Sequence, residues 1–258
     1  MNNNDHQLTN DCACLSVIIP VYNEAATLPR VVRKLAATPH LREVIIVDDC
    51  STDETPNQIQ LLQSEFSNIK SQRLKKNSGK TAALKAGFAM SSGEIVIIQD
   101  ADLEYDPVDI PAVIQPIIEK RADVVYGSRF LVRRATRVLY FYHYLANKFL
   151  TFFSNLFTNL NMTDIETGYK AFRGDIIREM VIVSTRFGFE VEVTAKVAKL
   201  NLAIFEVPIS YYGRTYAEGK KISTMDGVTA IWLIVRFNLF WSARSSFRTS
   251  PKEMSDML

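Results

Sequence analysis

The sequence has few cysteines, no long apolar run and almost no net charge. Its three cysteines are too few for a disulfide framework and suggest a reducing compartment. No segment reaches the roughly 18 consecutive apolar residues of a membrane-spanning helix. The nearest approach, residues 228–241, is interrupted by Arg236 and Asn238. A formal net charge of +2 is too close to neutral to indicate a nucleic-acid-binding protein.

Two common phosphate-binding motifs are also missing from the sequence. No expected strand is followed by the G-x-G-x-x-G fingerprint of dinucleotide-binding proteins. Residues 79–81 resemble the end of a Walker A loop, but Leu74 stands where the first glycine of that loop should be. A P-loop nucleoside triphosphatase is therefore disfavoured.

What is present is a regular alternation of apolar strands and helices. The chain of 258 residues is 47% apolar, which fits one large domain with a sizeable core. Residues 1–14 are polar, lack the features of a signal peptide, and are expected to be a mobile leader. Short β-branched runs separated by helical patterns predict an α/β fold with a mostly parallel sheet covered on both faces. The expected strands are 15–20, 43–47, 69–74, 94–98, 123–126 and 202–208.

Two aspartates directly follow the buried strand 94–98. Open α/β sheets bind ligands at the carboxyl ends of their strands. Asp100 and Asp102 are two residues apart, so both can reach one hard divalent cation, which Mg²⁺ typically shares with substrate phosphates. The alternative is an acidic turn before a helix, since Asp106-Pro107 has the form of an N-cap followed by a first-turn proline.

Basic residues follow two other expected strands. Arg129 leaves the strand 123–126, and its planar fork suits phosphate oxygens, although a surface arginine is the alternative. Residues 211–222 form a basic loop with two glycines, and such a loop can close over phosphates as a lid.

The region 137–160 differs from the rest of the chain because it is crowded with aromatic residues. We expect one long helix or two, with aromatic side chains on more than one face. Arg133, Arg134 and Arg137 precede or open this region, and such a combination suits anionic lipid headgroups. A core or dimer helix is the alternative. A second apolar helix is expected over 225–243.

Six ordered motifs together resemble one known family. They are 16–24 (SVIIPVYNE), 47–53 (VDDCSTD), 77–84 (NSGKTAAL), 100–104 (DADLE), 127–129 (GSR) and 167–170 (TGYK). In this order they resemble family 2 glycosyltransferases of the GT-A fold, in the dolichyl-phosphate mannose synthase-like branch. The resemblance covers roughly residues 15–225. It departs from the family pattern at Cys50, where glycine is usual, and at Glu104, where relatives carry glutamine.

The resemblance implies a GT-A architecture, a Rossmann-like three-layer sandwich with a mostly parallel central sheet and peripheral amphipathic helices. It places the glycosyltransferase domain at 15–224, with membrane- or dimer-facing helices inserted at 137–160. A C-terminal apolar helix and polar tail occupy 225–258. Many relatives add two or more transmembrane helices there, so the chain resembles the soluble or peripheral type.

The resemblance also assigns roles to single residues. Asp49 would accept hydrogen bonds from the base, and Asp100 and Asp102 would hold Mg²⁺ or Mn²⁺ on the donor diphosphate. Asp102 and Asp164 would be the catalytic residues, with Asp164 near the acceptor. The donor-binding residues would be Pro20, Tyr22, Asn23, Glu24, Asp49, Lys80, Asp100, Ala101, Arg129, Arg214 and Lys220.

The implied reaction is an inverting transfer of a hexose from a nucleotide-diphosphate sugar of the GDP-mannose or UDP-glucose type. The acceptor would be a polyprenyl phosphate, dolichyl or undecaprenyl, at the cytoplasmic membrane face, with the enzyme attached peripherally and homo-oligomerisation left open. A soluble or glycan hydroxyl acceptor would instead need a general base, for which Asp164 or Glu166 are candidates. A non-catalytic nucleotide-sugar-binding subunit is disfavoured because both metal-ligand candidates are present. The lack of Gln-x-x-Arg-Trp disfavours a processive polysaccharide synthase, and the lack of a glycine-rich, Arg-containing loop after the first strand disfavours a nucleotidylyltransferase.

Overall fold

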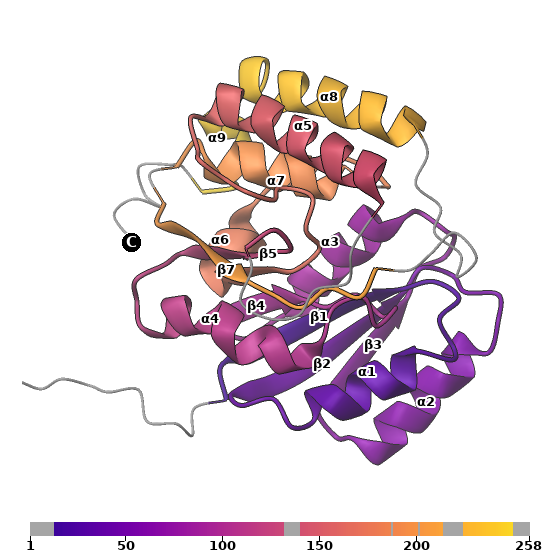
Figure 1. The fold of residues 1–258 in the computed structure, drawn as a ribbon. Coiled ribbons are helices and arrows are strands. Elements are labelled where there is room, and N and C mark those ends of the chain that lie inside the picture. The colour runs from indigo at the N-terminus through magenta and orange to yellow at the C-terminus, as the bar shows by residue number, and fades with distance from the viewer. Residues whose placement is uncertain (1–12, 132–139, 187, 201, 214–223, 250–258) are drawn as a thin grey trace, which may run out of the picture.

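The computed structural model describes residues 13–131, 140–186, 188–200, 202–213 and 224–249 (Figure 1). The strands are β1 (Leu15–Val21), β2 (Leu41–Asp48), β3 (Ile69–Arg73), β4 (Ile95–Ile98), β5 (Val124–Ser128), β6 (Lys170–Arg173) and β7 (Ile204–Pro208). The helices are α1 (Leu28–Leu35), α2 (Thr55–Glu65), α3 (Lys80–Met90), η1 (Pro107–Asp109), α4 (Ile110–Ile118), α5 (Phe141–Thr158), α6 (Gly174–Glu179), α7 (Phe189–Val197), α8 (Thr224–Leu239) and α9 (Ala243–Ser246).

The described strands form one seven-stranded sheet in the order β3-β2-β1-β4-β6-β5-β7. Pairing is parallel throughout except at β6, which runs antiparallel between β4 and β5. The sheet confirms the predicted α/β fold and its mostly parallel character. Because β1, β2, β4 and β5 run in one direction, their carboxyl ends meet at one edge, where α/β sheets bind ligands.

Two apolar cores, one on each face of the sheet, hold the layers together. Along β1 the side chains alternate, so that Ile18 enters one core and Ile19 the other. Helices α1, α2 and α4 cover one face, and α3, α6 and α7 cover the other (Figure 1). The strands are apolar on both faces because both faces are covered.

Helices α5 and α8 form a further layer outside α7 (Figure 1). The aromatic region predicted as one helix or two is the single helix α5 in its described part. Helix α8 belongs to the same core as the sheet, since Ile234 and Phe237 are fully buried in it. The C-terminal apolar helix expected over 225–243 is thus integral to the packing, and it ends at Leu239.

No helix in the described ranges combines the length and apolar character needed to cross a bilayer. Several predicted residues fall outside the described ranges, and for these the predictions stand without a structural account. They are Arg133, Arg134, Arg137, Arg214 and Lys220.

Candidate active site

The loop after β1 interlocks with the loop after β2. The Asn23 backbone N–H donates to Ser51 Oγ at 3.0 Å, and Asn23 Oδ1 accepts from the Thr52 backbone N–H at 2.8 Å. The Glu24 backbone N–H donates to Thr55 Oγ1 at the start of α2. The strand β1 continues one residue past Pro20, to Val21, which pairs with Asp48, and the next residue, Tyr22, is 45% exposed. Tyr22 therefore lies on a loop that hydrogen bonds hold in place, and its predicted contact with the nucleoside remains a prediction.

Asp49 orders the loop that begins α3. Its Oδ1 accepts from the Ser78 backbone N–H, and its Oδ2 accepts from the Gly79 backbone N–H, both at 2.7 Å. The residue is almost fully buried. Both carboxylate oxygens thus already accept hydrogen bonds from the protein backbone. The contact between Asp49 and the nucleobase remains a prediction. The next residue, Cys50, has a φ of 63°, a left-handed conformation in which glycine would be unstrained.

The N-terminus of α3 is fastened to the segment before α7. Gly79 has a φ of +90°, and a Cβ at this position would lie 2.6 Å from the Arg186 Cα. The Thr81 backbone N–H and side-chain hydroxyl both donate to the Arg186 carbonyl oxygen, at 3.0 and 2.7 Å. Glycine at position 79 therefore permits the close approach, and Thr81 fixes it.

Lys80 lies at the centre of a charged cluster. Its Nζ is 2.9 Å from Asp100 Oδ1, 3.1 Å from Asp100 Oδ2 and 3.3 Å from Glu190 Oε1. Burial alone would lower the pKa of the Lys80 ammonium, but Asp100 and Glu190 outweigh burial and raise that pKa above its usual value. Lys80 is thus a permanent cation beside a predicted metal ligand.

The glycine of the TGYK motif lies directly against this cluster. A Cβ on Gly168 would lie 2.5 Å from Asp100 Oδ2 and 3.3 Å from Lys80 Nζ. The Gly168 backbone N–H donates to the Tyr105 hydroxyl at 2.9 Å. Any side chain at position 168 would therefore displace the Asp100 carboxylate.

Asp102 lies in the tight turn that follows β4. Its Oδ1 accepts from the Glu104 backbone N–H at 3.1 Å, and Leu103 between them has a φ of 64°. Ala101 is buried beneath the turn. The helical cap expected after this turn is Asp106, whose Oδ1 accepts from the Val108 backbone N–H. The N-cap that the sequence indicated at Asp106 is thus present, Asp102 also orders the turn itself, and metal binding by Asp100 and Asp102 remains a prediction.

Glu104 joins the turn after β4 to the segment after β7. The Tyr211 hydroxyl donates to Glu104 Oε2 at 2.6 Å, and the Tyr212 backbone N–H donates to the Glu104 carbonyl oxygen at 2.9 Å. The Tyr211 ring packs on Tyr105. Sequence reasoning gave no role to Tyr105 or Tyr211, because their contacts join segments about a hundred residues apart.

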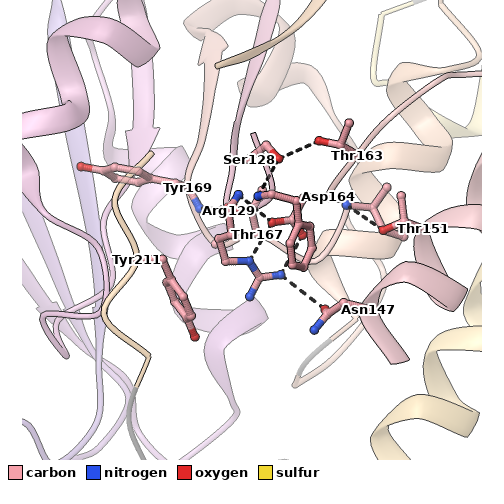
Figure 2. Close-up of polar contacts among 12 residues, drawn as sticks. Ser128, Arg129, Asn147, Thr151, Thr163, Asp164, Thr167, Tyr169 and Tyr211 are labelled. Atoms are coloured by element: carbon pink, nitrogen blue, oxygen red, sulfur yellow. Dashed lines mark hydrogen bonds and ion pairs between the residues drawn. The ribbon is translucent and has the colours of Figure 1, made fainter. Parts of the chain in front are cut away.

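Arg129 and Asp164 form a bidentate pair (Figure 2). Arg129 Nε and Nη2 each donate to a different Asp164 oxygen at 2.7 Å, and the Arg129 backbone N–H donates to Asp164 Oδ2 at 3.1 Å. Asp164 is fully buried, and the Arg129 side chain is only 9% exposed. The structure thus disfavours the surface-arginine alternative for Arg129.

The pair also sets the charge state of Asp164. Burial would raise the pKa of the Asp164 carboxyl, but the adjacent Arg129 guanidinium lowers it below its usual value. A carboxylate that is engaged by both oxygens and held ionised is a weak proton acceptor. The geometry therefore favours a positioning role for Asp164 over that of a general base.

Arg129 also connects the site to helix α5. Its Nη2 donates to Asn147 Oδ1 at 3.4 Å, and its guanidinium lies 5.2 Å from the Tyr211 ring centroid (Figure 2). Lys148, the next residue of α5, has its Nζ 4.4 Å from the Phe130 ring centroid. Two cations thus lie where the strand β5 meets the aromatic helix.

Glu166 and Lys170 are ionisable groups held within the protein next to the site. Burial and the Glu190 charge raise the pKa of Glu166 to about 7, and its Oε1 makes no hydrogen bond. Burial lowers the pKa of Lys170 to about 8, although its Nζ donates to the backbone oxygens of Ile165 and Thr167. Lys170 therefore shapes the TGYK loop, and Glu166 is a group that can change charge near neutral pH.

The donor set at the end of β4 suits a metal that is shared with a substrate. No group of three or more His, Cys, Asp or Glu side chains able to hold a metal occurs in the part of the chain that the structure describes. Asp100 and Asp102 supply two carboxylates, and Mg²⁺ usually completes such a set with water and substrate phosphates. The residues present therefore fit a divalent cation brought in with a diphosphate.

Similarity to known proteins identifies the family of the chain. Residues 16–181 match the model of glycosyl transferase family 2. The undecaprenyl-phosphate mannosyltransferase of Micrococcus luteus is 30% identical over 218 residues, covering 79% of this chain and 85% of that protein. The dodecaprenyl-phosphate galacturonate synthase of Rhizobium johnstonii is 27% identical over 236 residues, covering 89% of this chain and 68% of that protein.

Solved structures of glucosyl-3-phosphoglycerate synthase from Mycobacterium tuberculosis share the fold. The complex with UDP has a TM-score of 0.68 and 18% identity, covering 93% of this chain and 91% of that one. The complex with Mn²⁺, UDP and glucosyl-3-phosphoglycerate has a TM-score of 0.65 and 18% identity, covering 92% and 86%. The chain therefore has the GT-A fold and belongs to glycosyl transferase family 2, and it is a glycosyltransferase.

Proposed function

We propose that this enzyme transfers a hexose from a nucleotide-diphosphate sugar to a polyprenyl phosphate at the inner face of a membrane, with inversion at the anomeric carbon. The observation that carries the proposal is the contact between Arg129 and Asn147. It joins a cationic residue of the site to a helix whose outer surface is apolar. An acceptor with an anionic head and an apolar tail matches that arrangement. The two polyprenyl-phosphate transferases described above support it.

The outer surface of α5 is unusual for a surface helix. Its buried side chains are Leu150, Thr151 and Ser154, two of which are small and polar. Most of its exposed side chains are large and apolar, and helix α8, which packs beside it, exposes more of them. Those that are more than half exposed are Phe141, Tyr142, Leu145, Phe149, Phe152 and Leu156 on α5, and Val228, Trp232 and Leu239 on α8. We call this set the α5–α8 surface.

A lipid bilayer is the occupant we assign to the α5–α8 surface. Aromatic side chains suit the headgroup level of a membrane, where a helix can lie without spanning. The basic residues that precede α5 in the sequence, Arg133, Arg134 and Arg137, would add attraction to anionic lipids. A polyprenyl phosphate keeps its tail in the bilayer, so its phosphate would reach the protein beside α5.

The donor side of the site is the edge formed by β1, β2 and β4. We assign the nucleoside to the loops that present Tyr22 and Asn23, and the diphosphate to the region of Lys80, Asp100 and Asp102. Asp100 and Asp102 would hold Mg²⁺ or Mn²⁺, which when bound neutralises negative charge on the leaving diphosphate. Lys80 lies 2.9 Å from Asp100 and would add a second positive charge there.

The acceptor side needs a positive charge but no strong base. A phosphate monoester is already anionic at neutral pH, so its oxygen can attack the anomeric carbon without first losing a proton. Arg129, oriented by Asp164, would hold that phosphate and fix the direction of attack. Because burial at the pair excludes water, the electrostatic attraction is stronger than it would be at the surface.

A hydroxyl acceptor is the second candidate, and Glu166 is the observation that favours it. A hydroxyl must lose its proton during attack, and the pKa of Glu166, raised by burial and Glu190 to about 7, suits a general base. Its Oε1 has no hydrogen-bond partner. The two acceptors predict different consequences for Glu166→Gln, since only hydroxyl transfer needs the carboxylate as a base.

A panel of nucleotide sugars tests the proposal. Release of nucleoside diphosphate is measured with each donor, in the presence of polyprenyl phosphate, a water-soluble glycan or no acceptor. We expect one donor to give fast release that depends on polyprenyl phosphate and is retained in Glu166→Gln. Release that depends on the glycan, and is lost in Glu166→Gln, would replace the lipid acceptor with a hydroxyl.

A further inference from the structure

The Lys80 ammonium lies between carboxylates from two different elements. Both Asp100 oxygens are within 3.1 Å of Lys80 Nζ, and Glu190 Oε1 is at 3.3 Å. Asp100 follows β4, whereas Glu190 is the second residue of α7. Lys80 is the first residue of α3, so it lies at the positive end of that helix dipole. Its position there depends on the two carboxylates.

The distance between Lys80 and Glu190 is set by the backbone. The double hydrogen bond from Thr81 to the Arg186 carbonyl oxygen ties the first turn of α3 to the segment that leads into α7. The close approach of Gly79 to Arg186 leaves little room for that segment to shift. Glu190 is 8% exposed and lies in the first turn of α7, where an acidic residue is favoured by the helix dipole. Glu190 is therefore a fixed negative charge beside a flexible lysine.

Asp100 cannot bind the Lys80 ammonium through both carboxylate oxygens and bind a divalent cation at the same time. A cation bound to Asp100 and Asp102 would lie beside the Lys80 ammonium, and like charges a few ångströms apart repel strongly in a partly buried site. Asp100 has little freedom to turn away, because Gly168 packs against its Oδ2. The lysine side chain is the mobile partner, so it is Lys80 that must give way.

We propose that Lys80 is a resident cation, whose ammonium occupies the cation position at Asp100 until the metal displaces it. Glu190 is then the positioning residue that holds the displaced Lys80 ammonium beside the incoming diphosphate. This inference rests on the metal site of the proposed function. The Glu190 carboxylate balances the charge of the displaced ammonium, so that the exchange leaves no unpaired charge in a buried position. Lys80 then faces the diphosphate that arrives with the metal, rather than leaving the site.

A double-mutant cycle on Mn²⁺ binding tests the inference. Binding of Mn²⁺ to the protein without donor is measured by electron paramagnetic resonance or calorimetry in wild type, Lys80→Met, Glu190→Gln and the double variant. We expect Lys80→Met to tighten Mn²⁺ binding and Glu190→Gln to weaken it, each by about fivefold, which is a normal coupling between neighbouring groups. With Lys80 already replaced, Glu190→Gln should change the Mn²⁺ affinity by less than about twofold.

Binding of UDP or GDP at saturating Mn²⁺ gives a second readout. Both single variants should bind the diphosphate more weakly than wild type, and the double variant should bind no more weakly than Lys80→Met. Non-additivity of this kind shows that Glu190 acts through Lys80. Lys85→Met is the matched control, since Lys85 is exposed on the same helix, and it should change neither affinity. Thermal unfolding of each variant separates these effects from loss of fold.

Two outcomes would overturn the inference alone. Lys80 is no resident cation if Lys80→Met leaves Mn²⁺ binding unchanged or weaker. Glu190 acts on the metal directly if Glu190→Gln has the same effect with and without Lys80. A wild type that binds no Mn²⁺, even with UDP or GDP, overturns the inference together with the metal site. The identity of the acceptor is tested separately, by the panel of nucleotide sugars. If the lipid acceptor is wrong, the double-mutant cycle on Mn²⁺ binding can still be interpreted.

Discussion

The Arg129 guanidinium and the Asp164 carboxylate form a buried pair, in which Nε and Nη2 each lie 2.7 Å from a different carboxylate oxygen. The pair ties the end of β5 to the loop that precedes β6 and contacts α5 through Asn147 (Figure 2). One interaction therefore holds together the three segments that meet where we propose the acceptor binds. It has consequences both for stability and for catalysis.

Asp164→Asn should lower the stability of the protein markedly. Removal of one partner leaves the Arg129 charge buried without compensation, and this typically costs about 3–5 kcal/mol. Urea unfolding at pH 7 measures the loss. Glu65→Gln is the matched control, because Arg33 and Glu65 form a similar two-bonded pair on the surface. It should leave the unfolding midpoint almost unchanged, and an equal loss in both variants would contradict the role of burial.

The same pair predicts how stability responds to acid. Because Arg129 lowers the pKa of Asp164 in the folded state, the pair's contribution is fully present above the unfolded pKa of about 3.9. It is lost as the pH falls through the lower, folded pKa. Unfolding experiments from pH 6 down to pH 2 should therefore show wild type and Asp164→Asn converging in acid. Parallel curves over this range would contradict the prediction.

Glu166→Gln should alter the pH dependence of stability in the opposite sense. Burial and Glu190 raise the pKa of Glu166 to about 7 in the folded state, so between its unfolded pKa and pH 7 the folded protein holds the extra proton. Stability contributed by this site then falls as the pH rises, by up to about 1.4 kcal/mol per pH unit. Glutamine mimics the protonated acid, so the variant should lose that decline and exceed wild type in stability at pH 8. Urea midpoints between pH 4.5 and pH 8 check this.

Asp102→Asn should abolish transfer and leave the fold intact. The substitution removes a charged oxygen ligand from a turn at the sheet edge and touches no core contact. Chelation with EDTA should inactivate the wild type, and Mn²⁺ or Mg²⁺ should restore activity. Asp175→Asn, which weakens a partly buried pair with Arg173 outside the site, is the control and should stay active. Full activity in EDTA would refute the metal assignment.

The strands and the sheet edge could be predicted from the sequence because they depend on local patterns. Short β-branched runs such as that ending at Ile98 are buried on both faces and stop at polar residues. The parallel direction of the strands then places their ends at one edge. The positions of Asp100, Asp102 and Arg129 at that edge were predicted in this way, without knowledge of any contact.

The strand β6 was missed, and its composition explains why. It contains only four residues, two of them basic, in a segment for which no strand was expected. Lys170 is nonetheless fully buried, since its ammonium donates to backbone oxygens of its own loop and lies 4.9 Å from the Tyr126 ring centroid. No periodicity in so short a segment reveals a strand that forms only between two neighbours.

The partners within the site could not be predicted, because each pair joins distant segments. Asp164 is 35 residues from Arg129, and Glu190 comes from a helix 110 residues after Lys80. For α5 the sequence predicted the helix but not which face is exposed, since its aromatic residues occupy more than one face. Only the packing of α5 on α7 and α8 shows that Thr151 and Ser154 face inward.

Replacing part of the α5–α8 surface should release the protein from membranes. The side chains of Phe141, Phe149 and Phe152 are 67%, 53% and 65% exposed, so their triple change to serine removes little core packing. We expect wild type to float with anionic liposomes at low salt and to be partly released at high salt, because charge attraction is screened. The triple variant should stay with the soluble fraction under both conditions.

A control on another part of the molecule separates this effect from a general loss of apolar surface. Leu61 on α2 and Val108 on η1 are 61% and 63% exposed, away from the α5–α8 surface, and their change to serine should leave flotation unchanged. Nucleoside diphosphate binding should persist in both variants, since the donor side is untouched. The competing account is a dimer formed through the α5–α8 surface, which light scattering would detect as a salt-independent oligomer. A dimer that does not bind liposomes at any salt concentration would overturn the membrane assignment and, with it, the lipid acceptor.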